Sequence, residues 1–204
     1  MKLFLLLALV SCANHYQEPT KITQSYNVTV DAISSPNSSN YKSFAIVGEI
    51  NDLQFQEASA IVSRGLVHSS FVQSESPDKA DLKLTLTYTI GEPVSTVESD
   101  SVPHSVTSDV RTVYGARVGS ITGTNYRTEI ETITRYKREL KLVAKDNQGH
   151  TIWEVRSISK GRSSNLREIV PFLAFAATSV SGTNYNATMQ IPENDPRVLK
   201  LAKE

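Results

Sequence analysis

Strict alternation of apolar and polar residues in two stretches places the strongest constraint on the fold of this chain. Over residues 82–90, leucine, tyrosine and isoleucine at even positions alternate with lysine and threonine at odd positions. Residues 128–144 repeat the pattern over a longer stretch, with charged residues at most odd positions. Because successive side chains of a β-strand point to opposite faces, both stretches predict strands with one apolar and one wet face. Such half-solvated strands favour an antiparallel sheet over a doubly wound parallel sheet.

Two helices are expected, one after the second strand and one that follows the last strand. Asn51 or Asp52 can cap the first helix, which begins near Leu53 and carries apolar residues at helical spacing. Asn165 and Glu168 fit a capping box for a second helix that runs from residue 166 to about 180. Pro171 is expected to kink this helix or to mark its true start. Shorter strands are expected at residues 26–30, 41–47, 71–72 and 151–155, the last after a turn at residues 146–149.

The order of these elements predicts one α+β domain over residues 26–181, in which two helices cover one face of an antiparallel sheet. Residues 91–127 have too little apolar content to form a second core. We expect them to form a long hairpin or excursion from the sheet. Residues 182–204 are expected to be a polar C-terminal tail, with a short helix around 198–201.

The N-terminal residues indicate an exported protein. Lys2 precedes an apolar run over residues 3–10, which is far shorter than the roughly 20 apolar residues that cross a bilayer. Cys12 is the single cysteine of the chain and closes this run. It resembles the lipobox cysteine of bacterial lipoproteins, which is lipidated and becomes the first residue of the mature protein. Cleavage by an ordinary signal peptidase near Ser11 or Ala13 is the alternative, and Cys12 is then incidental.

The lipobox resemblance implies a signal peptide at residues 1–11 and a lipidated tether at residues 12–25. Ala13 follows the cysteine, so an aspartate that would retain the protein in the inner membrane is absent. The resemblance therefore implies the periplasmic face of the outer membrane. Three acyl chains on one residue would anchor the protein firmly, because each buried methylene group contributes about 0.8 kcal/mol.

Composition argues against a protein that attracts nucleic acid by its net charge and against one that disulfides stabilise. The chain is 39% hydrophobic and 21% charged, as expected of an ordinary globular domain. Its 21 basic and 21 acidic residues give a formal net charge of +0, so no overall field attracts nucleic acid. With Cys12 lipidated no disulfide can form, and stability must come from a packed core.

Four features occur in a characteristic order: Tyr41-Lys42-Ser43-Phe44, Ala80-Asp81-Leu82-Lys83-Leu84, Trp153 after the hairpin turn, and the closing apolar helix. Together with the lipobox, they resemble a family of small Gram-negative envelope lipoproteins built on one domain of unknown function. The resemblance covers roughly residues 26–180. The family carries no agreed catalytic residues, so the resemblance implies a fold and a location only.

No catalytic residue, metal site or cofactor is expected. The four histidines, His15, His68, His104 and His150, lie apart, and none has a partner at the spacing of a helical zinc site. His68-Ser69-Ser70 lacks the flanking glycines of a nucleophile elbow. The series Gly115, Gly119 and Gly123 lacks the Gly-Lys-Ser/Thr ending of a phosphate loop and is expected to form a flexible hairpin tip.

Two surfaces could contact a partner. The charged positions of residues 129–141 form either a solvated sheet face or a docking surface. The apolar run at residues 170–177 is either buried against the sheet or directed toward a partner or a membrane. We place the expected partner contacts on the excursion and the wet sheet face, at Tyr114, Arg117, Tyr126, Arg135 and Lys137.

Three functions follow from these expectations. The first is a non-enzymatic outer-membrane lipoprotein whose domain binds another component of the envelope in the periplasm. The second is a carrier of a small apolar ligand or lipid in a cleft between helix and sheet. The third, an envelope hydrolase, would need a cluster of serine, histidine and aspartate, or a pair of carboxylates, in the folded chain.

Overall fold

The computed structural model describes residues 24–48 and 52–203. In this part of the chain, the strands are β1 (Ser25–Ser34), β2 (Ser43–Val47), β3 (Val72–Gln73), β4 (Leu82–Ile90), β5 (Val94–Arg111), β6 (Arg117–Lys145), β7 (Thr151–Gly161) and β8 (Tyr185–Pro192). The helices are α1 (Leu53–His68), α2 (Leu166–Thr178) and α3 (Pro196–Lys203), with one 3-10 turn at Ser38–Asn40. None of these helices is long and apolar enough to cross a membrane.

The strands form one mixed sheet, and this corrects the predicted fold class. The order is β3-β2-β4-β6-β7-β1-β8, with β5 paired to β6 off this path. β2 runs parallel to both β3 and β4, while the remaining pairs are antiparallel. An antiparallel sheet with two helices is therefore wrong, because the sheet is mixed and α3 is a third helix. Alternation identifies the two faces of a strand, but it carries no information about the direction of its neighbours.

The parallel pair arises because α1 connects β2 to the strands that follow it. A crossover helix allows two successive strands to lie parallel, whereas a short turn does not. Asp81 fixes the join between β2 and β4. Its Oδ2 accepts hydrogen bonds from the backbone N–H groups of Lys42 (3.1 Å) and Ser43 (2.8 Å), and its own N–H donates to Ser43 Oγ (2.9 Å). The bonds from Ser43 and Lys42 hold the pKa of Asp81 below its usual value.

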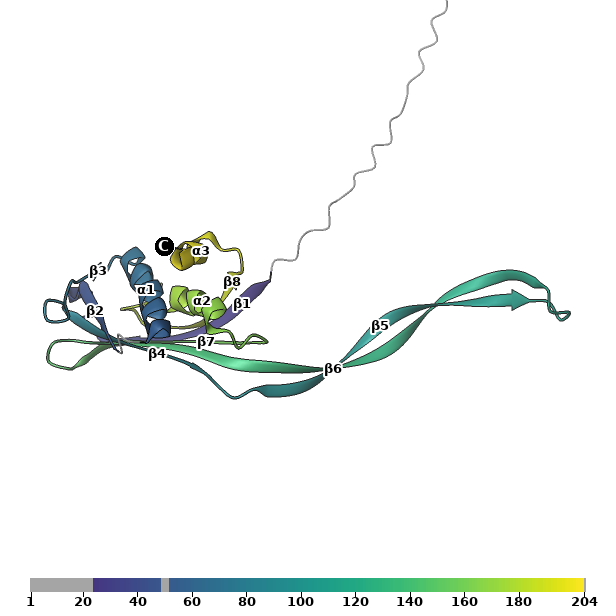
Figure 1. The fold of residues 1–204 in the computed structure, drawn as a ribbon, viewed down its shortest axis with the longest axis horizontal. Helices are drawn as coiled ribbons and strands as arrows, with labels where there is room; N and C mark the ends of the chain where they lie inside the picture. Colours follow the sequence, from purple (N-terminus) through teal and green to yellow (C-terminus); the bar gives the residue numbers. More distant parts are fainter. Residues whose placement is uncertain (1–23, 49–51, 204) are drawn as a thin grey trace, which may run out of the picture.

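Helices cover one face of the sheet and leave the other face open (Figure 1). The core lies between them and is formed by alternate residues of β1, β4, β6 and β7, together with the inner faces of α1 and α2. Asp52 caps α1 by accepting a bond from Gln54 N–H (2.8 Å), as the sequence predicts, while Asn51 lies outside the described residues. Asn165 caps α2, and its side chain also bonds Glu168 (3.0 Å).

The apolar run at residues 170–177 is buried, so the interpretation that directs it toward a partner is wrong. Every residue of this run except Phe175 is buried, and Phe175 is partly covered. α2 is enclosed because it packs on the sheet, on α1 and on α3. Pro171 lies inside the helix, which begins at Leu166.

The residues expected to form a polar tail instead complete the sheet and the core. β8 pairs with β1 along its full length, from Ser25 opposite Pro192 to Ala32 opposite Tyr185. Val198 and Leu201 of α3 are buried, with exposed fractions of 1% and 2%. The sequence gives little sign of β8 because an edge strand buries few of its side chains. In β8 only Ile191 is fully buried.

A two-stranded ribbon extends from one end of the sheet (Figure 1). β5 pairs with the first part of β6, from Val94 opposite Arg135 to Arg111 opposite Arg117. We call residues 94–135 the arm. At about 3.3 Å per residue its strands reach about 60 Å beyond the body. The excursion predicted for residues 91–127 thus forms a regular β-ribbon, which extends further along the chain than expected.

The burial of α3 predicts the effect of truncating its inner leucine. Leu201→Ala is expected to lower the free energy of unfolding by about 2–5 kcal/mol, because it removes a fully buried side chain. Leu199→Ala, on the same helix and 38% exposed, should change it by no more than about 0.5 kcal/mol. Urea unfolding followed by circular dichroism measures both. Equal, small effects would show that α3 contributes nothing to the core.

Candidate functional site

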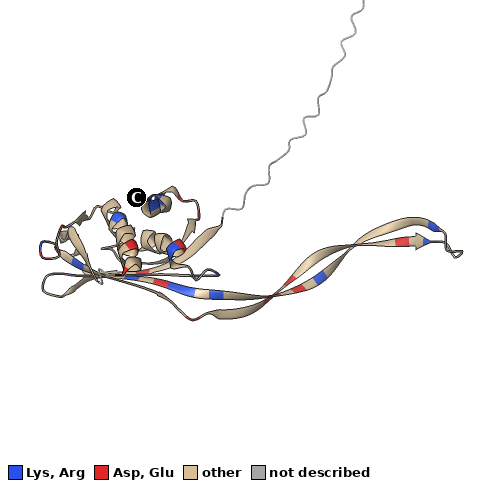
Figure 2. Ribbon diagram, in the orientation of Figure 1, with Lys and Arg blue, Asp and Glu red and all other residues tan. Residues whose placement is uncertain are grey.

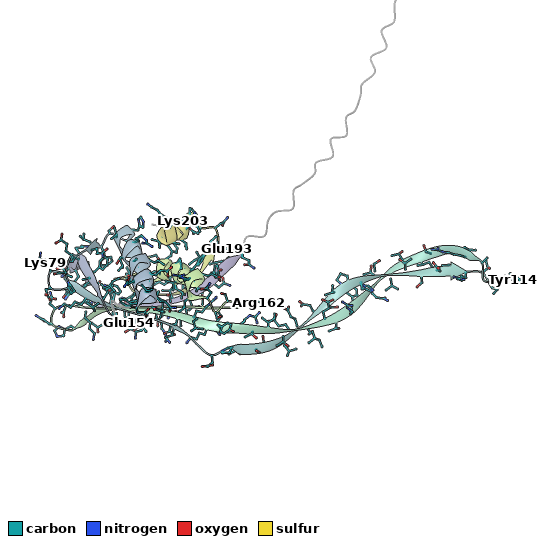
Figure 3. All side chains as sticks on the ribbon, in the orientation of Figure 1. Lys79, Tyr114, Glu154, Arg162, Glu193 and Lys203 are labelled. Carbon is teal, nitrogen blue, oxygen red and sulfur yellow. The ribbon has the colours of Figure 1, made fainter. Side chains whose placement is uncertain are left out.

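The arm is the described part of the chain with the fewest neighbours. β7 begins to pair with β6 at Tyr136, so on that side β6 has no described partner strand between Arg117 and Arg135. β5 pairs with β6 alone. Both edges of the ribbon thus present backbone groups that no described strand bonds. Figure 3 shows side chains projecting from the ribbon along its whole length, with Tyr114 at the far end.

The arm has one charged and one uncharged face. From Val94 opposite Arg135 to Val110 opposite Gly119, the odd-numbered residues of β6 share a face with the even-numbered residues of β5. The even-numbered residues of β6 and the odd-numbered residues of β5 share the opposite face. Charged side chains of both signs lie on the first face, which we call the charged face. They are Glu98, Asp100, Arg127, Glu129, Glu131 and Arg135. Figure 2 shows basic and acidic positions interspersed along the ribbon.

The opposite, uncharged face carries hydroxyls and scattered apolar side chains. Between residues 95–107 and 122–134 it has no charged residue. Two cross-strand pairs of hydroxyls are hydrogen-bonded, Ser95 with Thr134 (2.9 Å) and Thr107 with Thr122 (3.1 Å). Ile130 and Tyr126 stand on this face with exposed fractions of 73% and 72%.

Many apolar residues of the arm are exposed. At the tip, Val113 and Tyr114 are 98% and 96% exposed, and Ile121 on the charged face is 67% exposed. A single exposed valine or isoleucine is ordinary, but a thin ribbon that exposes aromatic and branched residues along its whole length is typical of a contact surface.

The charged face of the arm continues onto the open face of the sheet, because β6 runs through both. Glu139 of β6 accepts two hydrogen bonds from Arg156 of β7, at 2.6 and 2.8 Å. Lys137 Nζ lies 3.3 Å from Glu139, and Lys141 Nζ lies 2.7 Å from Glu154. The bonds from Arg156 outweigh the cost of partial burial and hold the pKa of Glu139 below its usual value.

The five residues predicted to contact a partner are spread along the arm and β6, on both faces, and do not converge. Tyr114 is at the tip, and Tyr126 is on the uncharged face. The three basic residues each have an acidic partner. Arg117 lies 2.9 Å from Asp109, Arg135 lies 2.6 Å from Glu98, and Lys137 lies 3.3 Å from Glu139. Cys12 lies outside the described residues.

Ser69 and His150 each bond a neighbouring group of the fold. Ser69 Oγ donates to the carbonyl oxygen of Thr178 (2.9 Å), and His150 Nδ1 pairs with Asp146 (3.1 Å) on the surface. Within residues 24–48 and 52–203, no cluster of acidic, histidine or cysteine side chains could hold a metal ion. Gly115 sits in the tip turn with φ of +83°, whereas Gly119 and Gly123 lie within β6 and not at a flexible tip.

Sequence reasoning missed Arg138, which is buried where the arm joins the body. Its exposed fraction is 1%, and its Nη1 donates to the carbonyl oxygen of Ser163 (3.2 Å). Gly161 makes room for it, since a Cβ at Gly161 would lie 2.5 Å from Nη2. Burial lowers the pKa of Arg138. The alternation of lysines and glutamates on the other face of β6 gave no sign of a buried arginine.

A cleft of about 640 Å³ lies between α1, α2 and the end of β4. Apolar side chains form most of its wall, among them Ala58, Ile61, Ile90 and Val170. Polar residues also line the cleft, among them Glu57 and Arg167, whose ion pair (2.7 Å) joins the two helices. The cleft therefore has the chemistry of a site for a mainly apolar molecule that also carries a polar group.

A second cavity, of about 410 Å³, is lined by His68, Arg197 and Lys200. Arg197 and Lys200 lie where α1 and α2 end, so their positive charges offset the negative ends of the helix dipoles. Arg197 is also held by Asp195, at 2.7 Å, and stacks 4.8 Å from the ring centre of Phe175. Arg197 is thus held by Asp195 and Phe175 without an anionic ligand.

No family model matches the sequence, and no curated protein matches it. Among solved structures, a PDZ domain protein from Parabacteroides distasonis is 12% identical with a TM-score of 0.48. That match covers 82% of this chain but 39% of the other. Two structures of the PelC dodecamer from Paraburkholderia phytofirmans are 16% and 14% identical, with TM-scores of 0.37 and 0.38. They cover 74% and 78% of this chain, and 95% and 99% of theirs. At TM-scores below 0.5 these similarities carry no conclusion about function.

The lowered pKa of Glu139 predicts how the charged face depends on pH. Its contribution to stability is present above the ordinary pKa of a glutamate and is lost as the pH falls through the lowered pKa of the folded state. Glu139→Gln should therefore lower the free energy of unfolding by about 1 kcal/mol at pH 7. The difference from the wild type should vanish in acid.

Urea unfolding between pH 7 and pH 3 measures this difference. Glu131→Gln is the matched control, because its side chain is 65% exposed on the same face of the same strand. A Glu139→Gln difference that stays constant with pH would contradict the role given to the ionised carboxylate.

Proposed function

We propose that this protein is a lipid-anchored binding and assembly module of the outer membrane, that its domain faces the periplasm, and that it has no catalytic activity. Its arm is the element that contacts another component of the cell envelope. The observation that carries this proposal is a ribbon about 60 Å long with two unpaired edges and exposed apolar side chains.

The low stability of an isolated two-stranded ribbon supports the proposal that a partner covers the arm and stabilises it. An isolated hairpin is at best marginally stable in water, since each strand has one neighbour and neither face is buried. Ordering some forty residues costs conformational entropy that such a hairpin offsets poorly. A partner strand or surface would bury Tyr126 and Ile130 and would bond the free backbone groups.

β1 begins at the same end of the sheet as the arm, which supports an N-terminal anchor close to the base of the arm. Val28 pairs with Ser159, which pairs with Arg138, so Ser25 lies at the end of the sheet from which the arm leaves. A lipid on Cys12 would hold this end toward the membrane. The arm would then start near the bilayer and reach proteins beside it.

A shortened arm tests the contact. Residues 97–132 are replaced by Asn-Gly, which leaves Thr96 opposite Ile133 to close a short hairpin. Crosslinking and pull-down from intact cells should recover envelope partners with the wild-type chain and lose them with this variant. Unchanged recovery would refute the assignment of the contact to the arm.

A second variant separates the anchor from the contact. Cys12→Ser should release the protein from membranes without detergent, while the shortened-arm variant should stay membrane-bound. The intact mass of the detergent-extracted wild type should show an N-terminus at Cys12 with acyl chains. A wild-type chain that starts elsewhere, or washes off freely, would refute the lipid anchor.

The cleft favours a second candidate function, transport of a small apolar molecule. Under this function, native mass spectrometry of the full chain should show a co-purifying ligand. Ile90→Lys puts a charge on the wall of the cleft and should abolish the additional mass that the bound ligand contributes. A ligand-free wild type from several expression hosts would exclude the carrier and leave the arm as the functional element.

A further inference from the structure

The charge of the arm changes sign along its length. The base of the arm, residues 94–100 and 128–135, carries four acidic residues and one arginine. The rest of the arm, residues 101–127, carries three arginines and one aspartate. A negatively charged surface would therefore repel the base of the arm and attract the part that lies farther from the body.

The far end of the arm exposes large apolar side chains. We call residues 109–121 the distal end. Val113 and Tyr114 of its turn are 98% and 96% exposed, and Val118 and Ile121 beside the turn are 62% and 67% exposed. Figure 3 shows Tyr114 at the extreme end of the ribbon, away from the body. Tyrosine combines an apolar ring with a polar hydroxyl, which suits the interface between a membrane and water.

The order of side chains along the distal end matches the order of layers in a bilayer. Arg111 and Arg117 are paired across the two strands, and Tyr114 is three residues from each. At the rise of a strand, the arginines lie about 7–10 Å behind the apex of the turn. The head-group layer on each side of a bilayer is about 5–7 Å thick. With the turn in the outer acyl region, the two guanidinium groups therefore lie at the level of the lipid phosphates.

We infer that the distal end of the arm docks on the bilayer that holds the lipid anchor, with Val113 and Tyr114 in the outer acyl region and Arg111 and Arg117 on anionic phospholipid head groups. This inference rests on the proposed lipid anchor, and it adds a second contact with the same membrane. The partner is the lipid surface, which the apolar turn and the two cations recognise together.

The two arginines are free to change partners. Arg117 lies 2.9 Å from Asp109, and Arg111 lies 4.0 Å from the same carboxylate. Their side chains are 63% exposed for Arg111 and 62% exposed for Arg117, and exposed ion pairs of this kind contribute little. Phosphate is a favourable replacement, because a guanidinium group can donate two parallel hydrogen bonds to it.

The lengths of tether and arm permit this contact. Residues 13–24 span at most about 40 Å when fully extended. The arm reaches about 60 Å from the body, so an arm inclined toward the bilayer meets it at any extension of the tether. Two apolar residues and two arginines would bind a vesicle only weakly from solution. On an anchored chain the same contact is intramolecular, which raises its effective concentration.

A tryptophan in the turn tests the docking. The full, lipidated Tyr114→Trp chain is reconstituted into vesicles of phosphatidylethanolamine and phosphatidylglycerol. Its emission should shift to shorter wavelength and should be quenched by brominated phospholipid. Trp153, the single native tryptophan, is 1% exposed and gives a constant background. Ile130→Trp is the matched control, because Ile130 is 73% exposed on the acidic base of the same arm and its emission should stay unshifted.

The composition and dilution of the vesicles separate the parts of the inference. Vesicles of phosphatidylcholine, which carry no net charge, should abolish most of the shift of Tyr114→Trp. Dilution of the anionic vesicles should leave the shift unchanged, because the arm and its anchor lie on one membrane. A shift that disappears on dilution would overturn docking on the same bilayer.

Charge variants of the Tyr114→Trp chain test the role of the arginines. The double change Arg111→Gln and Arg117→Gln should lower the ratio of docked to free arm about 25-fold, since each basic residue near an anionic surface contributes about a factor of five. Asp109→Asn should raise the ratio, because it releases both arginines and removes a negative charge. If the ion pairs served only the structure of the arm, both variants would act in the same direction.

Emission from Tyr114→Trp that is the same in anionic and neutral vesicles, or the same as from Ile130→Trp, would overturn the inference. A shift seen in whole envelopes but not in pure lipid vesicles would also overturn it, since the distal end would then bind a protein. The anchor has its own readout in the acylated mass at Cys12. Unshifted emission from a chain that carries the acyl chains would therefore refute the docking alone.

Discussion

The backbone N–H and C=O groups of a strand need partners on both sides, and β6 meets this need in the body of the protein but not in the arm. The architecture depends on this difference. β6 is 29 residues long and belongs to two structures. From Tyr136 onward it has β4 on one side and β7 on the other, beneath two helices. Before Tyr136 it has β5 alone among the described strands. One continuous strand thus connects a well-packed domain to a ribbon whose outward backbone groups, about half of each strand's total, bond no described strand.

The same strand carries its alternation from the body into the arm. Odd positions are charged from Arg127 to Lys141 apart from Ile133, so the open face of the sheet and the charged face of the arm are one surface. Even positions change from buried leucines under the helices to hydroxyls and exposed Ile130 in the arm. The uncharged face has the pattern of a half-buried sheet but lacks a cover, which is why we propose that another chain supplies it.

Sequence reasoning recovered what local chemistry determines. The caps at Asp52 and Asn165 and the alternation in β4 and β6 each reflect interactions within a few residues. It could not recover the parallel β2, because pairing direction depends on where α1 returns the chain. It missed β8 for a similar reason, since an edge strand carries a weak apolar pattern. The charges of the candidate site were visible in the sequence, but a free strand edge is defined by which strands fail to extend beside it.

Amide hydrogen exchange of the membrane-anchored chain tests the central claim that another component of the cell envelope covers the arm. In dilute, detergent-dispersed protein, the outward-facing amides of both strands of the arm should exchange freely. In intact membranes, peptides from at least one of the two strands, β5 or β6, should become protected. Exchange of both strands in the membrane at the rates seen in dilute protein would contradict the account.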